Sequence, residues 1–356
     1  MHKYFLTLYQ LFFKINSMIS RFLSLLLVLT ILTPACRNKK HIYANFAGFT
    51  QGTTYSIVYD NEKNIIADSL KVKVERILYE FDQSLSIYND SSIISKINHN
   101  EEAIPDSFFI EVFNKSLFIS ELTGGAFDIT VGPLVRAWGF GTDAHKDFTI
   151  EKHDSLMQLI GMDKVSLVNG HLIKSNAGIY LDVNAIAQGY SVDVICRYFD
   201  KLGIKNYLVE IGGEVRTKGT RSGKLWKIGI DRPEDNNLSP GQTLQAIITL
   251  SDEALATSGN YRKFYVENGI KYSHTIDPRT GYPAQNRLLS ATIITEDCII
   301  ADGIATACMV MGTDKAIEFI NRFPQFNAYL VFSDEEGNFK SWASENLKAN
   351  ISDEGN

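Results

Sequence analysis

The sequence has few cysteines, and none of them stands in a metal-binding pattern. Four cysteines occur in 356 residues, without a Cys-X-X-Cys pair or a Cys/His spacing. This argues against a zinc site. Cys196, Cys298 and Cys308 lie in or at the start of apolar helical patterns, so we expect them to be small buried residues. In an exported protein, two of them could instead form a disulfide.

An excess of positive charge and any internal repeat are also missing. The formal net charge is −6, which gives no reason to expect a nucleic-acid partner. The sequence contains no repeat and no low-complexity tract, and no shift of composition marks a domain boundary. A chain of this length can form one large domain or two ordinary ones with a sizeable core, and one mature domain is the simplest interpretation.

The apolar run near the N-terminus is short. Phe22–Leu32 falls below the roughly 20 residues that cross a bilayer comfortably. Its length is typical of the apolar part of a signal peptide. The segment Leu32–Cys36 (LTPAC) resembles the lipobox of bacterial lipoproteins, in which the cysteine is lipidated and becomes the mature N-terminus. Pro34 is unusual in that box.

These features predict an exported lipoprotein that starts at Met1 or at Met18, since Met18–Arg21 would form a conventional n-region. We expect a signal peptide over residues 1–36 that ends at lipidated Cys36, a tether over 37–47, a folded domain over 48–345 and a tail over 346–356. The alternative is an uncleaved N-terminal anchor. In both cases the domain lies outside the cytoplasm, and we expect it at the periplasmic face of the inner membrane.

Apolar periodicity and turn residues predict alternating strands and helices. Strands are expected at 49–59, 165–168, 172–174, 207–211, 215–219, 226–230 and 244–250. Helices are expected at 65–81, 91–98, 108–122, 151–160, 186–202 and 297–312. Asn169–Gly170 is a strong signal for a hairpin turn.

The stretch Leu181–Asp193 suggests a ligand site. Ile179–Leu181 has the character of a buried strand end, Asp182 interrupts it, and a helix follows with residues 186, 190, 194, 198 and 202 on one face. A turn before a helix N-terminus binds anions, because free N–H groups and the helix dipole point into it. A carboxylate there suits a hydroxyl, an amide or a metal ion. We therefore expect a phosphorylated cofactor and a divalent cation. The alternative is an ordinary helix started by Asp182.

A second acidic feature lies in Asp297–Gly312, which is apolar and helical apart from Asp302 and Thr306. Their i, i+4 spacing places both on one face. A carboxylate in such a helix is costly unless something compensates it, and Mg²⁺ bound by oxygen ligands would do so. Alternatively, Asp302 bonds to a neighbouring backbone group and Thr306 bonds back along its own helix.

Two further segments suggest ligand contacts. Pro133–Gly141 (PLVRAWGFG) has aromatics between glycines, which is typical of a ligand loop but equally of a tight turn with a packed Trp138. His274 precedes an Asp277–Pro278 turn. Such a histidine is either an accessible base or a structural hydrogen-bonding group.

Together these pieces resemble the ApbE-type FAD:protein FMN transferases, and the resemblance covers Phe49 to Gly312. Each block alone is weak, but their number, order and spacing carry the assignment. The blocks are Gln51–Thr53 (QGT), Leu85–Tyr88 (LSIY), Gly125–Gly132 (GAFDITVG), Trp138–Gly141 (WGFG), Leu181–Gly189 (LDVNAIAQG), Gly212–Glu214 (GGE), Ser258–Asn260 (SGN), His274–Gly281 (HTIDPRTG) and Ala301–Thr306 (ADGIAT).

The resemblance implies an α+β fold: a single domain of mixed or antiparallel sheets flanked by helices, related to the T-fold. It implies that FAD is split at its pyrophosphate, that FMN is joined to a threonine hydroxyl of an acceptor protein, and that AMP leaves. Acceptors would be exported flavoproteins, such as subunits of membrane redox complexes. Mg²⁺ would be bound by the side chains of Asp302 and Thr306 and by the carbonyl of Ala185.

The resemblance also assigns the residues that contact FAD, and it gives His274 a second role as the base that deprotonates the acceptor threonine. The positions matching FAD contacts are Gln51, Tyr88, Ala126, Phe127, Asp128, Asp182, Gln188 and His274. A neutral imidazole with a pKa of about 6.5 could act as that base.

Four positions depart from the family pattern. Gln51 replaces the usual Met, and Asn184 stands where Gly is usual. Gln188 replaces a Lys or Glu and removes a charge near the nucleotide. Ala305 offers no second carboxylate beside Asp302, which makes a two-metal site less secure.

Two other functions use the same residues. A Mg²⁺-dependent FAD pyrophosphatase would release FMN and AMP, because water would attack the same phosphorus. A lipid-anchored protein that only stores FAD belongs to a different class, and the presence of Asp302, Thr306 and His274 argues against it.

The role expected for His274 leads to a prediction. Replacing His274 with Ala should impair transfer to threonine more than it impairs FAD binding, because the imidazole would act on the hydroxyl proton. The two effects can be compared by measuring the transfer rate and, by fluorescence titration, the FAD dissociation constant. An equal loss of both would make His274 a binding residue only.

Overall fold

The computed structural model describes residues 42–140, 149–234, 241–259, 264–267, 270–273 and 275–353, together with 4, 8–9, 11–16 and 18 near the N-terminus. The chain divides into two units, residues 1–41 and 42–356. The expected lipobox with Cys36 lies outside the described residues, and so does His274. Among the helices in the described ranges, none is both long and apolar enough to cross a bilayer.

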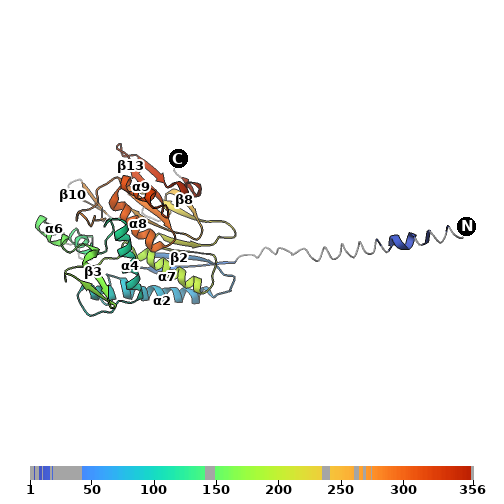
Figure 1. The fold of residues 1–356 in the computed structure, drawn as a ribbon, viewed down its shortest axis with the longest axis horizontal. Coiled ribbons are helices and arrows are strands. Elements are labelled where there is room, and N and C mark those ends of the chain that lie inside the picture. Colours follow the sequence, from blue (N-terminus) through green and yellow to red (C-terminus); the bar gives the residue numbers. More distant parts are fainter. Residues whose placement is uncertain are drawn as a thin grey trace. The chain divides into compact units, whose positions relative to one another are not determined.

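An eight-stranded antiparallel sheet forms the centre of the second unit, in the order β1-β2-β5-β6-β9-β12-β13-β14 (Figure 1). Its strands are β1 (Tyr43–Thr50), β2 (Thr53–Asp60), β5 (Tyr207–Ile211), β6 (Glu214–Lys218), β9 (Ala254–Gly259), β12 (Leu288–Thr295), β13 (Asn327–Ser333) and β14 (Phe339–Ala343). The order places β6 beside β9, although a long stretch of chain separates them.

The other strands in the described residues form three smaller sheets. The first joins β15 (Ile351–Asp353), β8 (Leu244–Leu250) and β7 (Trp226–Asp231) in that order. The others are the hairpins β3 (Val165–Val168) with β4 (His171–Lys174), and β10 (Phe264–Glu267) with β11 (Ile270–Ser273). The Asn169–Gly170 turn is confirmed, because Val168 pairs with His171.

The large sheet separates two cores. The side chain of Ile294 on β12 packs with Ile228 and Ile248 of the three-stranded sheet. Its neighbour Ile293 packs on the other side with the helices, for example with Ile304. Because successive side chains of a strand point to opposite faces, the small sheet covers one face and the helices cover the other.

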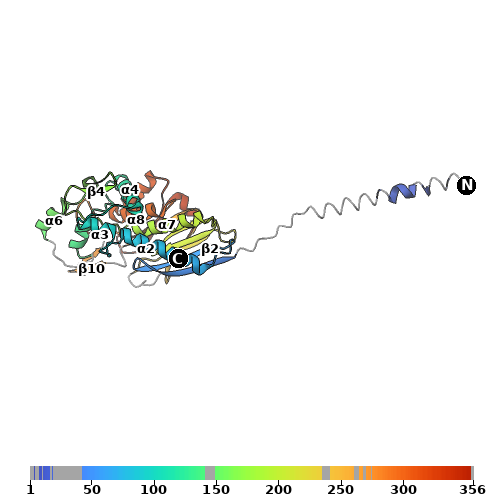
Figure 2. The same cartoon turned by 90° about the horizontal axis from the view of Figure 1, so that it is seen from below.

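The helix layer is arranged around two neighbouring helices, α7 and α8, which pack on each other and on the sheet (Figures 1 and 2). The helices are α2 (Ala67–Leu85), α3 (Ile93–Asn98), α4 (Ser107–Leu122), α5 (Gly132–Ala137), α6 (Ile150–Met157), α7 (Ala187–Lys201), α8 (Cys298–Met311) and α9 (Thr313–Arg322), with the 3₁₀ turns η1 (Met162–Lys164) and η2 (Glu345–Asn350). This agrees with the expected α+β class of antiparallel sheets flanked by helices.

The strand expected over 49–59 is confirmed from Thr53 onward as β2, but its first residues belong to a hairpin with β1. β1 and β2 pair with Thr50 opposite Thr53, so Gln51 and Gly52 form a two-residue turn. Both have positive φ, 50° and 72°, as a type I′ turn requires. Gln-Gly lacks the Asn or Asp that usually signals such a turn.

Two details of the Asp182 region also differ from expectation. Ile179–Leu181 is not a strand end; only Tyr180 forms an isolated bridge, with Val131. Along α7, Val192 and Phe199 are fully buried, whereas Tyr198, on the expected apolar face, is half-buried. α7 contacts the sheet, α8 and α2 at once, so it buries more than the single stripe that periodicity indicates.

The folded unit extends beyond both expected boundaries. β1 begins at Tyr43, inside the stretch 37–47 expected to be a tether, because its backbone pairs with β2. At the other end, residues 351–353 form β15 and pair with β8 instead of ending as a tail.

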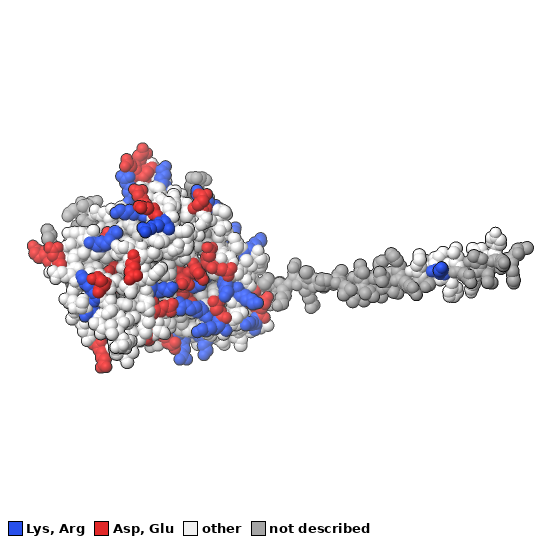
Figure 3. All heavy atoms as spheres, viewed as in Figure 1, with Lys and Arg blue, Asp and Glu red and all other residues white. Residues whose placement is uncertain are grey.

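On the face shown in Figure 3, acidic and basic side chains are intermixed.

Candidate active site

The segment that leads into the turn over residues 182–186 is held by buried polar side chains. Asn98 donates to the carbonyl oxygen of Leu181 (2.9 Å) and accepts from its N–H (2.7 Å). Lys174 donates from Nζ to the carbonyl of Ile179 (3.1 Å). These side chains replace the backbone partners that a neighbouring strand would supply, which explains how an apolar segment is buried here without being a strand.

Asp182 closes the turn and does not cap the helix. Its N–H donates to the carbonyl of Ile129 (2.7 Å), and its Oδ1 accepts from the N–H of Asn184 (2.9 Å). α7 begins at Ala187, after Ile186, without a side-chain cap. An ordinary helix started by Asp182 is therefore not what the structure contains. The N–H groups of Ile186 and Ala187 both donate to the carbonyl of Val183 (3.1 and 2.9 Å), so the start of α7 is satisfied largely by backbone.

Tyr88 lies next to this turn. Asn184 donates from Nδ2 to the Tyr88 hydroxyl (3.2 Å). Partial burial and the negative charge of Asp182 raise the pKa of that hydroxyl. Tyr88 is nevertheless 66% exposed, so it offers an aromatic surface to a ligand. The side chain of Asn184 is tolerated because it is exposed and bonded to Tyr88.

One N–H of the first turn of α7 bonds to the buried acid of α8. Gly189 donates its N–H to Oδ2 of Asp302 (3.0 Å). A Cβ on Gly189 would lie 2.5 Å from the carbonyl oxygen of Cys298 and 2.7 Å from Cβ of Asp302, so only glycine permits this approach. Asp302 is 6% exposed, and burial raises its pKa to about 7.

The other two expected cation ligands lie on the elements that meet at Asp302. Oγ1 of Thr306 is 3.1 Å from Oγ of Ser258 on β9, so its hydroxyl points out of α8 toward the sheet. Ala185 lies in the turn itself and packs against the main core cluster. The turn also contacts α8 directly, because Cδ1 of Ile186 lies 3.6 Å from where a Cβ of Gly303 would be.

Gln188 joins the helix start to the β5–β6 hairpin. Its amide atoms lie 2.9 and 3.0 Å from where a Cβ of Gly212 would be, and Cγ2 of Thr53 lies 3.0 Å from the same point. Gly212 has a φ of +67° and donates its N–H to the carbonyl of Thr54 (3.0 Å). The β1–β2 turn, the β5–β6 turn and α7 therefore meet at this point.

Gln51, in the β1–β2 turn, has buried polar atoms without a partner. Neither Nε2 nor Oε1 of its amide makes a hydrogen bond to the protein. Burying an amide without partners is unfavourable. The position matched to a FAD contact is therefore polar and unsatisfied in this chain.

Residues 126–128 lie beside the Asp182 turn, but their side chains are buried or hydrogen-bonded to other parts of the protein. Ala126 and Phe127 are 1% and 2% exposed. Oδ1 of Asp128 accepts from the N–H and hydroxyl of Thr130 (2.7 and 2.6 Å), and Oδ2 accepts from the N–H of Met162 (3.1 Å). Any FAD contact of this segment would thus be made mostly by backbone atoms.

The loop that follows His274 is fixed by an aromatic cluster. Trp138 donates from Nε1 to the carbonyl of Gly281 (2.8 Å). His153 stacks on Tyr282, and its Nε2 lies 2.8 Å from the carbonyl oxygen of Thr280. This agrees with the alternative of a packed Trp138.

Glu214 lies near the start of α7, although no role was expected for it from the sequence. It is 7% exposed, and its Oε2 has no hydrogen-bond partner. Burial and the charge of Asp302 hold the pKa of its carboxyl well above the usual range. The sequence signal was its position after Gly212–Gly213 at the start of a strand, but only the structure shows that it is buried.

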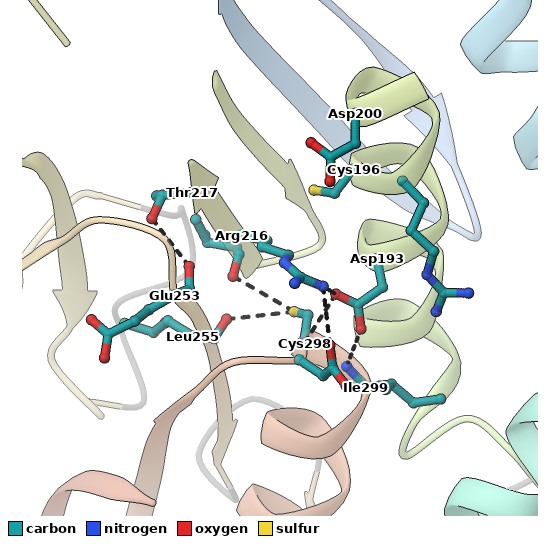
Figure 4. Close-up of polar contacts among 12 residues, drawn as sticks. Asp193, Cys196, Asp200, Arg216, Thr217, Glu253, Leu255, Cys298 and Ile299 are labelled. Carbon is teal, nitrogen blue, oxygen red and sulfur yellow. Dashed lines mark hydrogen bonds and ion pairs between the residues drawn. The ribbon is translucent and has the colours of Figure 1, made fainter. Parts of the chain in front are cut away.

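A buried ion-pair network fixes the start of α8 (Figure 4). Asp193 of α7 is fully buried and accepts from the N–H groups of Cys298 (3.1 Å) and Ile299 (2.9 Å). Arg216 of β6 pairs with Asp193 and also contacts Asp297 (3.3 Å). Because these bonds join α7, β6 and the first turn of α8, they set the position of Asp302 one turn further along.

The described residues contain no cluster of three or more His, Cys, Asp or Glu side chains that could bind a metal ion. A cation here would therefore depend on mixed oxygen ligands. The three described cysteines, Cys196, Cys298 and Cys308, are buried and free, which confirms the expectation of small buried residues.

The matches to known proteins cover the elements that form this site. Residues 51–330 match the ApbE family. An FAD:protein FMN transferase from Vibrio cholerae is 37% identical over 318 residues, covering 86% of this chain and 92% of that protein. One from Haemophilus influenzae is 34% identical and covers 85% of this chain and 90% of that protein. The structure of the flavin transferase ApbE from V. cholerae has a TM-score of 0.78 at 35% identity, covering 87% and 99% of the two chains.

The tight contact at Gly189 leads to a prediction. Gly189→Ala should lower the free energy of unfolding by about 1–3 kcal/mol, because its Cβ would collide with backbone and Cβ atoms of α8. Urea denaturation measures the change. Gly178→Ala is the control, since its Cβ would meet only side-chain ends of Asn176 and Leu159 at 3.2–3.3 Å. Equal stability of both variants would contradict the close packing of α7 on α8.

Proposed function

We propose a detailed reaction from the premise that this chain belongs to the ApbE family and, like its relatives, is a flavinyltransferase. The enzyme moves the FMN moiety of FAD to a threonine hydroxyl of an acceptor flavoprotein. The threonine oxygen forms a new bond to the FMN phosphorus, the pyrophosphate bond breaks and AMP leaves. The threonine proton passes to a base, for which His274 is the candidate.

The observation that carries this proposal is the contact between Gly189 and Asp302. A helix N-terminus attracts phosphate through its dipole, and the N-terminus of α7 lies directly against a buried carboxylate. Phosphate and carboxylate repel each other, so a site that holds both needs a cation between them. The same contact brings the turn that carries Ala185 onto the helix that carries Thr306.

The residues present fit Mg²⁺. Asp302, Thr306 and the carbonyl of Ala185 supply a carboxylate, a hydroxyl and a carbonyl, all hard oxygen donors of the kind that Mg²⁺ prefers. We propose these three as its protein ligands. When bound, Mg²⁺ would neutralise charge on the pyrophosphate and on the departing AMP.

The remaining residues bind and orient FAD. The N-terminal end of α7 offers the favourable end of a helix dipole to a phosphate, and the exposed ring of Tyr88 offers a stacking surface. Gln188 at the start of α7 and Gln51 in the β1–β2 turn offer polar side chains to FAD. Residues 126–128 offer backbone atoms to it. Positioning of this kind supplies most of the catalysis in phosphoryl-type transfer.

A transfer assay tests the reaction. The protein is incubated with FAD, Mg²⁺ and candidate exported flavoproteins, and the acceptor is measured by mass and by flavin fluorescence on a denaturing gel. An acceptor gaining the mass of FMN at a threonine, with one AMP released, is the expected result. AMP without a modified acceptor would instead indicate a pyrophosphatase, and intact FAD after hours would indicate storage.

Replacing Asp302 sharpens the test. Asp302→Asn keeps an oxygen that can accept from Gly189 but removes the charge, so kcat should fall by about 100-fold or more and lose its Mg²⁺ dependence. Asp314→Asn is the control, because Asp314 is an exposed acid in the first turn of the next helix, α9. We expect it to stay within about threefold of wild type. Full activity of Asp302→Asn would refute the metal assignment.

The segment Phe22–Cys36 supports a further proposal about location: export, and anchoring through a lipid on Cys36 at the periplasmic face of the inner membrane. Cells fed a palmitate analogue should label the wild-type protein but not Cys36→Ser, and labelling of both would contradict lipidation at Cys36. Subunits of membrane redox complexes would then be acceptors within reach.

A further inference from the structure

Glu214 is the least satisfied acid of the site region. It is the first residue of β6, only 7% exposed, and its Oε2 bonds to no protein group. Burying an unpaired carboxylate oxygen is costly, and proteins avoid it unless a partner or an ion compensates the charge. The strand could have carried an apolar residue here, so this group requires an explanation.

The alternation of β6 fixes the direction of this side chain. Val215 packs in the core under the three-stranded sheet. Arg216 points to the opposite face, where it pairs with Asp193 of α7 and contacts Asp297 at the start of α8 (Figure 4). Glu214 lies two residues before Arg216 and therefore faces the same helix layer.

The preceding turn brings Glu214 to the end of α7 that Asp302 contacts. Gly212, two residues earlier, lies against the amide of Gln188. The next residue along α7, Gly189, bonds to Asp302. Sγ of Cys298, the first residue of α8, lies 3.6 Å from the carbonyl oxygen of Val215, the residue after Glu214. Glu214 thus lies where β6 meets the start of α7 and of α8, the helix that carries Asp302.

We propose that Glu214 is a further ligand of the cation held by Asp302, so that one divalent ion is bound between β6 and α8. This inference rests on the proposed function, because it concerns the same ion. Two carboxylates balance the charge of a divalent cation, and Mg²⁺ is commonly held by one or two of them. The protein should therefore bind the metal in the absence of a nucleotide. Glu214 supplies from the sheet the second acid that Ala305 does not supply on α8.

Metal binding without FAD tests this directly. Free Mn²⁺ is measured by electron paramagnetic resonance during titration of the full-length protein, with Mg²⁺ as competitor. Glu214→Gln keeps size and shape but removes the charge. We expect Mn²⁺ binding to weaken by about tenfold or more, since even outer-shell changes cost 10- to 100-fold. An unchanged dissociation constant would overturn the proposal.

Thermal unfolding separates ligation from a structural role. Without metal, Glu214→Gln should be about as stable as wild type, because burial already favours the neutral form of this carboxyl, which the amide resembles in size and charge. With Mg²⁺, wild type should gain in Tm and the variant should gain much less, since a ligand stabilises the state that binds it. A Tm lowered equally with and without Mg²⁺ would show a structural role and overturn the proposal.

Glu210→Gln is the matched control. Glu210 lies at the end of β5 in the same hairpin, also influences the charge state of Glu214, and uses Oε1 to accept from the N–H of Gly213 (2.9 Å). It should change Mn²⁺ binding by less than about threefold. An equal loss in both variants would indicate only a general negative potential. If wild type binds no Mn²⁺ the cation site itself fails, whereas normal binding in Glu214→Gln refutes only this inference.

Discussion

The site depends on one hydrogen bond between distant parts of the chain, from the N–H of Gly189 to Asp302. An isolated acid in the apolar helix α8 would be unstable, and a helix N-terminus stabilises it through a direct bond and a favourable dipole. This contact requires a glycine and brings the Asp182 turn onto α8. It places the turn that carries Ala185 beside the helix that carries Asp302 and Thr306, the three residues proposed as cation ligands.

The surrounding structure keeps that contact in register. Asp193 binds the first two N–H groups of α8, and Arg216 links this carboxylate to β6. On the other side, Asn98 holds both backbone groups of Leu181. Buried polar bonds of this kind are costly to break, so they specify one arrangement of α7, α8 and β6. The rigidity of the site thus comes from bonds that lie just outside it.

The sequence predicted those parts of the site whose signal is local. Asp302 and Thr306 could be recognised because an acid and a hydroxyl interrupt an apolar helix, and the Asp182 turn because it breaks an apolar run. Glu214 could not be recognised from the sequence, because only the structure shows that its carboxyl group is buried with an unpaired oxygen. The Gln51–Gly52 turn and the buried face of α7 were misjudged because tertiary pairing and packing on three sides overrode local pattern. The hydrogen bonds that the Asp128 carboxylate accepts from Thr130 and Met162 could not be predicted from the sequence either.

The separation of the paired residues along the chain has a consequence for how the protein matures. Gly189 and Asp302 are 113 positions apart, and β6 finds its neighbour β9 only after β7 and β8 have been made. Closing such long loops is slow, because the loss of chain entropy comes before the long-range contacts that stabilise the fold. A chain that ends before α8 lacks Asp302 and the bond that joins it to α7. Only a nearly complete copy of the domain can form this contact, and with it the candidate site.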